Sequence, residues 1–354
     1  MKIEELRTKI DKIDSEILKF LNERMEFVRQ IGLIKNESKE TVYRPEREKE
    51  IIDRLTRLGN DKLNTESIKA IFQEIFAVAR NIELPEQISY LGPEGSFTHQ
   101  AAESNFGSTS KYLPLNSIKS VFESVQSNKV KYGIIPLENN QEGIVQETID
   151  LLGKSNLTII AELPMSITFS FATRSKEINK IKRIYSKDIA LKQCKEFIRN
   201  YFGEEVECIP VNSTSAAVSY ADKQLDSAAI CSRFAAVQKN IPILFEKIED
   251  STNNHTRFVI LSSSVNKVKS KSDKTSILVN LSDGHGVLAE FLQEFHDAKI
   301  NLTKLESRPA KKGTDFKYVF YIDFQGHCLD GNFQIIYKRY QDNIKLLGSY
   351  PRMI

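Results

Sequence analysis

At 354 residues the chain is long for one hydrophobic core, so we expect two or three domains. Its 50 basic and 47 acidic residues nearly cancel, and a net charge of +3 argues against a nucleic-acid partner. The N-terminus is charged, and no apolar run reaches the ~18 residues of a membrane helix. We therefore expect neither a signal peptide nor a membrane partner.

Cysteines and histidines limit the chemistry further. The four cysteines, Cys194, Cys208, Cys231 and Cys328, are scattered without CxxC spacing, which predicts reduced, buried thiols in a cytoplasmic protein. The five histidines are dispersed and form no metal-ligand pattern. We therefore expect no metal and no other cofactor.

The first segment has the apolar period of a long helix. Apolar residues recur in steps of three and four, at Ile3, Leu6, Ile10, Ile13, Ile17, Phe20, Phe27, Ile31 and Ile34. Arg24 occupies a position in this apolar line, where a guanidinium needs a partner to offset its desolvation. Lys35 follows about three turns later on nearly the same face, roughly 16 Å away. Arg7 lies about a quarter-turn off the line, which suits another site, a partner chain or plain exposure to solvent.

Two more helices are predicted before residue 87. One covers residues 45–59, from a proline to a glycine, and carries Arg47 and Glu48 in its first turn. The other covers residues 64–84 and is stopped by Pro85. One stripe of it holds Phe72, Phe76, Ala79 and Glu83. Because three helices with so long a first member cannot easily enclose a core, we expect an intertwined homodimer.

Three stretches, LRTKIDKID, LNERMEFVRQIGLIK and YRPEREKEII, resemble the all-helical chorismate mutases. The resemblance implies rearrangement of chorismate to prephenate, a pericyclic step that needs confinement of the substrate and donors at the ether oxygen. It implies carboxylate binding or site ordering by Arg7, Arg24 and Arg47, ether-oxygen contacts by Lys35 and Glu83, a ring-hydroxyl contact by Glu48, and second contacts at Arg44 and Ala79.

Three of these positions depart from the pattern of that family. Ala79 replaces a common serine and Arg44 replaces an aspartate of some members, which leaves those two contacts open. Glu83 replaces the glutamine of some relatives and can donate to the ether oxygen only when it is protonated. We therefore expect mutase activity to fall as pH rises through the titration of Glu83.

From residue 87 the pattern changes to short apolar runs between helical stretches, which is typical of an α/β domain. Strands are predicted at 88–91, 132–137, 157–162, 181–185, 206–211, 227–231 and 258–261. Polar residues follow several of them, at the strand ends where open α/β sheets bind ligands. By itself, the polar stretch from Asn253 to Arg257 would indicate only a hydrogen-bonded cap at the start of a strand. The other polar strand ends make its Thr256 a candidate for a site.

Six collinear stretches resemble prephenate dehydratase: GPEGSFTHQAA, IPLENNQEGIV, YSKDIALKQC, STSAA, AAICS and NHTRF. The resemblance implies a two-lobed fold like that of periplasmic binding proteins. It implies a prephenate site lined by Glu138, Asn139, Ser186, Gln193, Thr256 and Arg257. Thr256 matches the family's essential threonine, and we interpret it as a hydrogen-bond donor to the departing hydroxyl. Arg257 either holds a carboxylate or belongs to a structural ion pair.

Three features depart from the dehydratase pattern. Asn140 replaces a serine, residues 187–189 replace a His-Pro-Gln type run, and Phe169 replaces a common histidine. The choice between prephenate and its transaminated form, arogenate, is therefore open.

Residues 263–274 have the serine- and lysine-rich composition of a flexible linker. The remainder predicts the order βαββαβ of a ferredoxin-like unit. Its loop DGHGVL, with INLTKLESRP and LGSYP, resembles the ACT domain of phenylalanine-sensitive dehydratases. The resemblance implies an allosteric L-phenylalanine site at Gly286, Val287, Leu288, Glu306, Ser307 and Arg308. The alternative is that ESRP is only a strand-end turn.

The sequence thus predicts a multidomain enzyme of L-phenylalanine biosynthesis. We expect an all-α chorismate mutase domain at 1–86, a two-lobed α/β prephenate dehydratase domain at 87–262, a linker at 263–274 and an ACT domain at 275–354. Such a chain would convert chorismate through prephenate to phenylpyruvate, as a homodimer or larger homo-oligomer inhibited by L-phenylalanine. The alternatives are a preference for arogenate, a ligand-binding or regulatory protein, and a chain with only one live active site.

Overall fold

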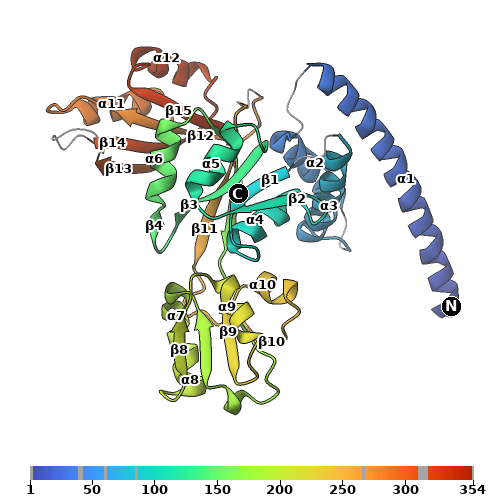
Figure 1. The fold of residues 1–354 in the computed structure, drawn as a ribbon. Helices are drawn as coiled ribbons and strands as arrows, with labels where there is room; N and C mark the ends of the chain where they lie inside the picture. The colour runs from blue at the N-terminus through green and yellow to red at the C-terminus, as the bar shows by residue number, and fades with distance from the viewer. Residues whose placement is uncertain are drawn as a thin grey trace. The chain divides into compact units, whose positions relative to one another are not determined.

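The computed structural model describes residues 3–38, 43–59, 62–83, 87–264, 268–309 and 318–352 (Figure 1). The chain divides into two compact units, Met1–Glu86 with Asn105–Lys111, and Gln87–Ser104 with Tyr112–Ile354. Among the described helices, none is both long and apolar enough to cross a membrane.

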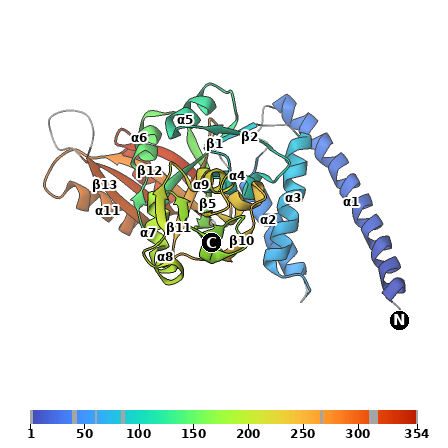
Figure 2. The same ribbon diagram turned by 60° about the horizontal axis from the view of Figure 1, so that its bottom comes forward.

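The first unit contains the three predicted helices, α1 (Ile3–Ser38), α2 (Pro45–Leu58) and α3 (Thr65–Glu83). Its buried apolar side chains include Ile68, Phe76 and Ala77 of α3. The apolar line of α1 is largely exposed, with Ile10 at 55% and Phe20 at 63%. In both ribbon views the N-terminal half of α1 stands clear of α2 and α3 (Figures 1 and 2). One chain therefore leaves a long apolar helix face uncovered.

The second unit begins with a sheet that we call the first lobe. Its strand order is β2-β1-β3-β11-β5, and β4 pairs with β3. The strands are β1 (Gln87–Leu91), β2 (Lys111–Leu115), β3 (Tyr132–Asn139), β4 (Gly143–Ile144), β5 (Thr158–Ser166) and β11 (His255–Ser262). The helices are α4 (Phe97–Phe106), α5 (Ile118–Gln126) and α6 (Gln146–Lys154). Strand β11 arrives from far along the chain and lies between β3 and β5, antiparallel to both.

The second lobe, yellow and green in Figure 1, is formed by the chain between β5 and β11. Its strand order is β10-β6-β9-β7-β8. The strands are β6 (Ser170–Ala172), β7 (Arg183–Ser186), β8 (Glu207–Pro210), β9 (Ser227–Cys231) and β10 (Ile243–Glu246). The helices are the 3-10 turn η1 (Ile178–Lys180), α7 (Asp188–Gln193), α8 (Lys195–Phe202), α9 (Thr214–Ala221) and α10 (Arg233–Gln238). The predicted order of strands in this segment is confirmed, while β2, β4, β6 and β10 were not predicted.

The C-terminal sheet has the predicted βαββαβ order, with strands arranged β13-β14-β12-β15. Its elements are β12 (Asp273–Asn280), α11 (Val287–Asp297), β13 (Leu302–Pro309), β14 (Tyr318–Gln325), α12 (Gly331–Arg339) and β15 (Ile344–Pro351). All its strand pairs are antiparallel, as in a ferredoxin-like fold.

The first lobe and the C-terminal sheet share one hydrophobic core. Val259 and Leu261 of β11 pack in the same buried cluster as Tyr321 and Leu347 of the C-terminal sheet. Gly348 of β15 lies so close to β5 that an added Cβ would sit 2.0 Å from a backbone oxygen. Only glycine allows this approach. The sheet is therefore packed directly against the lobe that contains Thr256.

Three cysteines, Cys194, Cys231 and Cys328, are buried free thiols. The prediction that all four are buried is wrong for Cys208, which is exposed. Cys208 lies on β8, the edge strand of the second lobe, so one of its sides has no neighbouring strand.

Candidate functional sites

The C-terminal end of α1 meets the end of α3 through a pair of opposite charges. Lys35 Nζ lies 2.5 Å from Glu83 Oε1, and their side chains are only 15% and 10% exposed. The two helices approach closely at Gly32, where an added Cβ would lie 3.1 Å from Glu83. The structure thus brings together the two residues predicted to contact an ether oxygen.

Arg24 lies over the same apolar face, as its place in the helix period predicts. Its guanidinium stands 5.8 Å from the centre of the Phe76 ring. Burial lowers the pKa of Arg24, and the nearby carboxylate of Glu48 opposes that shift. Burial raises the pKa of Glu48, while its ion pair with Arg80 acts in the opposite direction. Buried Ala79 lies on the same helix as Phe76.

Arg80 was missed in the sequence, although it lies between Phe76 and Glu83 on α3. Its guanidinium pairs with Glu48 and donates to the Asn105 carbonyl at 2.7 Å. It also stands over the ring of Tyr43 at 5.4 Å. Arg80 directly follows Ala79 of the apolar stripe on α3, and this third cation beside Arg24 and Lys35 could have been identified from the sequence.

Two other predicted residues, Arg7 and Arg47, do not join this group. Arg7 is 68% exposed and pairs with Glu4 one turn away. Arg47 is 66% exposed and pairs with a glutamate of its own helix. Arg44 immediately precedes α2 and is partly buried. At ~1.5 Å per residue, Arg7 is roughly 40 Å from Lys35 along α1, so both cannot contact one small substrate within a single chain.

The second candidate site lies where β3 ends beside the start of the antiparallel strand β11. Thr256 is opposite Asn139 in the strand register. The side-chain amide of Asn139 donates to Thr256 Oγ1 at 2.9 Å and to Asn254 Oδ1 at 2.8 Å. Because Asn139 occupies an acceptor position of the Thr256 oxygen, the hydroxyl proton remains available for a different acceptor.

The amide contacts continue into the second lobe. Asn254 donates to Gln193 Oε1 at 3.1 Å, and Gln193 donates to Gln141 Oε1 at 2.7 Å. The structure therefore gathers Asn139, Gln193 and Thr256 at the junction of the two lobes. Gln141, which directly follows the Glu-Asn-Asn run, was missed.

Ser186 is placed differently from these residues. It ends β7, is fully buried, and donates to the Ile230 carbonyl at 2.6 Å. Its hydroxyl therefore supports the strand pairing inside the second lobe in this structure.

Two family profiles match the chain in sequence order, chorismate mutase type II over residues 6–84 and prephenate dehydratase over residues 88–266. The bifunctional chorismate mutase/prephenate dehydratase of Aquifex aeolicus is 36% identical over 359 residues, which cover 99% of this chain and 98% of the relative. The chain belongs to the bifunctional chorismate mutase/prephenate dehydratase family.

Further similar proteins include a second bifunctional enzyme and a crystallised prephenate dehydratase. The bifunctional chorismate mutase/prephenate dehydratase of Pseudomonas aeruginosa is 32% identical, with 99% of this chain and 97% of the relative covered. The crystal structure of prephenate dehydratase from Arthrobacter aurescens in complex with L-Phe matches with a TM-score of 0.68 at 29% identity. That match covers 75% of this chain and 90% of the crystallised chain. As a bifunctional family member, the chain is both a chorismate mutase and a prephenate dehydratase of phenylalanine biosynthesis.

In this bifunctional enzyme, Glu138 and Arg257 face away from the Asn139–Thr256 pair. Arg257 is in ion-pair contact with Glu138, Glu162 and Asp323. Of the two alternatives for Arg257, the structure shows the ion pair. Successive residues of a strand point to opposite faces, so Glu138 cannot share a face with Asn139 on β3.

Two residues that depart from the dehydratase pattern, Asn140 and Phe169, make defined contacts in the structure. Asn140 donates to the Asn253 carbonyl at 2.9 Å and accepts from the His255 N–H at 2.8 Å. It thereby fixes the entry to β11 just before Thr256. Phe169 is buried against the ring of Phe97, with centroids 5.7 Å apart.

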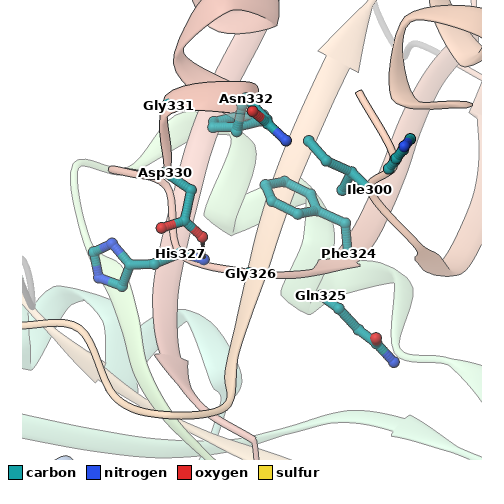
Figure 3. Close-up of a pocket in the computed structure, with 10 residues that line it drawn as sticks. Ile300, Phe324, Gln325, Gly326, His327, Asp330, Gly331 and Asn332 are labelled. Atoms are coloured by element: carbon teal, nitrogen blue, oxygen red, sulfur yellow. Dashed lines mark hydrogen bonds between the residues drawn. The ribbon is translucent and has the colours of Figure 1, made fainter. Parts of the chain in front are cut away.

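The C-terminal sheet contains two cavities of interest. One, of about 150 Å³, is lined by Leu281, Ser282, Asp283, Gly284, Val287, Leu288, Tyr318 and Phe320. Gly286 directly precedes α11 with a left-handed φ of 82°. The other, of about 340 Å³, lies between the end of β14 and the start of α12, with Phe324, Ile300 and Asn332 among its walls (Figure 3).

Only some of the predicted effector residues line the smaller cavity. Val287 and Leu288 line the smaller cavity. Glu306 and Ser307 lie on β13 and are not among its walls. Arg308 instead donates to the Gln146 carbonyl of α6 at 2.9 Å.

Proposed function

We propose that the Lys35–Glu83 pair and the Asn139–Thr256 pair are the two reaction centres of this bifunctional enzyme. At the first, the ammonium of Lys35 donates to the ether oxygen of chorismate, where negative charge develops as the carbon–oxygen bond breaks, and the Glu83 side chain contacts the same oxygen. Arg24 holds a substrate carboxylate, and Glu48 holds the ring hydroxyl.

At the second centre, the bond between the prephenate ring and its carboxylate breaks, and its electrons complete the aromatic ring as the ring hydroxyl leaves. Carbon dioxide departs, and the hydroxyl becomes water with a proton that solvent finally supplies. The observation that carries the assignment is the hydrogen bond from Asn139 to Thr256 Oγ1, which leaves the threonine proton to be donated to that hydroxyl.

Purified protein supplied with chorismate tests the whole assignment, because phenylpyruvate should accumulate without another enzyme. Parallel assays with prephenate and arogenate test the second substrate. We propose prephenate, and a faster turnover of arogenate would contradict that choice.

We propose a homodimer in which the mutase sites are shared. The exposed apolar line on α1 needs a partner helix, and Arg7 lies far from Lys35 on the same helix. A second α1 packed antiparallel on the first would bring the partner copy's Arg7 toward Lys35 of this chain.

Mixed dimers test this arrangement. Arg7→Ala and Lys35→Met should each lose mutase activity as homodimers. Co-refolding equal amounts should restore about a quarter of wild-type activity, because half of the dimers are mixed and each has one intact site. Mixtures as inactive as the separate variants would exclude shared sites. Each variant mixed with itself is the control.

We propose that the C-terminal sheet is an ACT domain that binds L-phenylalanine and inhibits dehydration. Support comes from the predicted Gly286–Leu288 loop beside the smaller cavity. The relative from Arthrobacter aurescens, whose crystal structure holds L-Phe, further supports it. Arg308 then acts on the contact between β13 and α6 rather than on the walls of that cavity.

Calorimetric titration with L-phenylalanine should detect binding to the wild-type chain. Gly284→Leu should weaken it by more than about tenfold, because an added Cβ already lies 2.9 Å from a Val287 methyl and a leucine would fill the cavity. Gly331→Leu, placed at the larger cavity where nothing lies within 4 Å of an added Cβ, is the matched control. Loss of binding in the control alone would move the effector to the larger cavity.

We also propose a cytoplasmic location, as expected for an enzyme with buried free thiols.

A further inference from the structure

Six charged side chains meet where the first lobe packs on the C-terminal sheet. Strands β3, β5 and β11 contribute two carboxylates and a guanidinium, while β12, β13 and β14 contribute two ammonium groups and a carboxylate. This six-charge cluster consists of Glu138, Glu162, Arg257, Lys274, Lys304 and Asp323.

Arg257 is at its centre. Its Nη1 lies 2.7 Å from Asp323 Oδ2 and 3.3 Å from Glu162 Oε2, and its Nε lies 2.9 Å from Glu138 Oε1. The Arg257 side chain is 10% exposed, and those of Glu162 and Asp323 are 2% exposed. Burial opposes the charge of Arg257, but Tyr321 and Asp323 raise its pKa well above the ordinary value.

The charges balance only when the two parts are together. The first lobe alone has two carboxylates and one cation, and the C-terminal sheet alone has two cations and one carboxylate. Lys304 pairs with the second oxygen of Glu138, and Lys274 lies 2.6 Å from Glu162. Because an unpaired buried charge is strongly unfavourable, the ion pairs with Lys304 and Asp323 favour this geometry of Glu138 and Arg257.

The cluster is joined to the dehydratase site through the backbone. Arg257 follows Thr256, Glu138 precedes Asn139, and the two dipeptides are opposite each other in the register of β3 and β11. The register shifts directly after Arg257, so Thr256–Asn139 and Arg257–Glu138 are the two residue pairs of β11 and β3 before the irregularity. A movement of Arg257 or Glu138 therefore moves the Asn139–Thr256 pair, and a displacement of ~1 Å can lower a catalytic rate by about 10²-fold.

We propose that Lys304 and Asp323, from the C-terminal sheet, are positioning residues for the dehydration of prephenate, acting through Glu138 and Arg257 on the Asn139–Thr256 pair. The inference rests on the proposed role of Thr256. The C-terminal sheet then completes the dehydratase site in addition to any effector that it binds.

Kinetics of the full-length chain test this proposal. Lys304→Met and Asp323→Asn should lower kcat for phenylpyruvate formation by about 10- to 100-fold, with KM for prephenate changed by less than about threefold. Chorismate mutase activity of the same preparation should be unchanged. Lys304→Arg, which keeps a cation beside Glu138, should restore most of kcat.

Lys274→Met is the matched control. It removes another ion pair of the same cluster, but Glu162 on β5 is not adjacent to Thr256 in the register. Its melting temperature should fall while kcat, measured below that temperature, stays near wild type. Adding Lys304→Met to Glu138→Gln should cause no further loss, because both changes act on one contact.

Two outcomes overturn the inference. In the first, Lys304→Met and Asp323→Asn have the same kcat as Lys274→Met. Lys304 and Asp323 would then have only a structural role. The other is additive losses in the double variant. Failure of the proposed function would be recognised by a different result. In that case Thr256→Ala would form phenylpyruvate at the wild-type rate, whatever the result for the Lys304 variants.

Discussion

Thr256→Ala should lower the rate of phenylpyruvate formation from prephenate by about 10²- to 10⁴-fold, the contribution expected of a positioned proton donor. Asn139 donates to the threonine oxygen at 2.9 Å, so the hydroxyl proton is directed to another acceptor. Alanine removes this donor to the departing hydroxyl. The measurement is kcat with saturating prephenate.

Thr256→Ser is the matched control, because it keeps the hydroxyl and should keep most of the rate. Mutase activity provides an internal reference, since the Lys35–Glu83 pair lies in the other compact unit. Phenylpyruvate formation by Thr256→Ala at the wild-type rate would remove Thr256 from the reaction.

Lys35→Met should lower chorismate mutase activity by about 10²- to 10³-fold, the loss expected when one donor to a developing negative charge is removed. Methionine keeps much of the apolar stem but has no ammonium group. Lys35 is only 15% exposed and lies 2.5 Å from Glu83, so its ammonium group is held in one position. Chorismate consumption is the measured quantity.

Lys12→Met, an exposed position on the same helix, should leave chorismate consumption unchanged. Dehydratase activity should be unchanged in both variants. If Lys35→Met lowered both activities equally, the residue would act on folding rather than on the mutase reaction.

The helices of the first unit and the order of the C-terminal elements were predictable, because each has a long and regular apolar period. Four strands, β2, β4, β6 and β10, were not. They have two to five residues, and none contains a run of five buried residues such as the one that marks the equally short β9. Their pairing depends on neighbouring strands that are distant in the sequence.

The candidate sites were predictable as sets of residues but not as geometries. Asn139 and Thr256 do meet, and Asn254 links Asn139 to Gln193, so the structure gathers three residues that the resemblance to prephenate dehydratase implied. Adjacent strand residues cannot share a face, which already separates Arg257 from Thr256. The sequence does not reveal which face meets the C-terminal sheet, and therefore did not predict the contact with Asp323.

The position of β11 has a consequence for synthesis of the chain. This strand fills the space between β3 and β5, yet it follows the entire second lobe in sequence. Until residue 262 has left the ribosome, β3 and β5 present open hydrogen-bonding edges that invite pairing with other nascent chains. Production of this enzyme should therefore be most vulnerable to aggregation during that interval, and a chain terminated within the second lobe cannot complete the first.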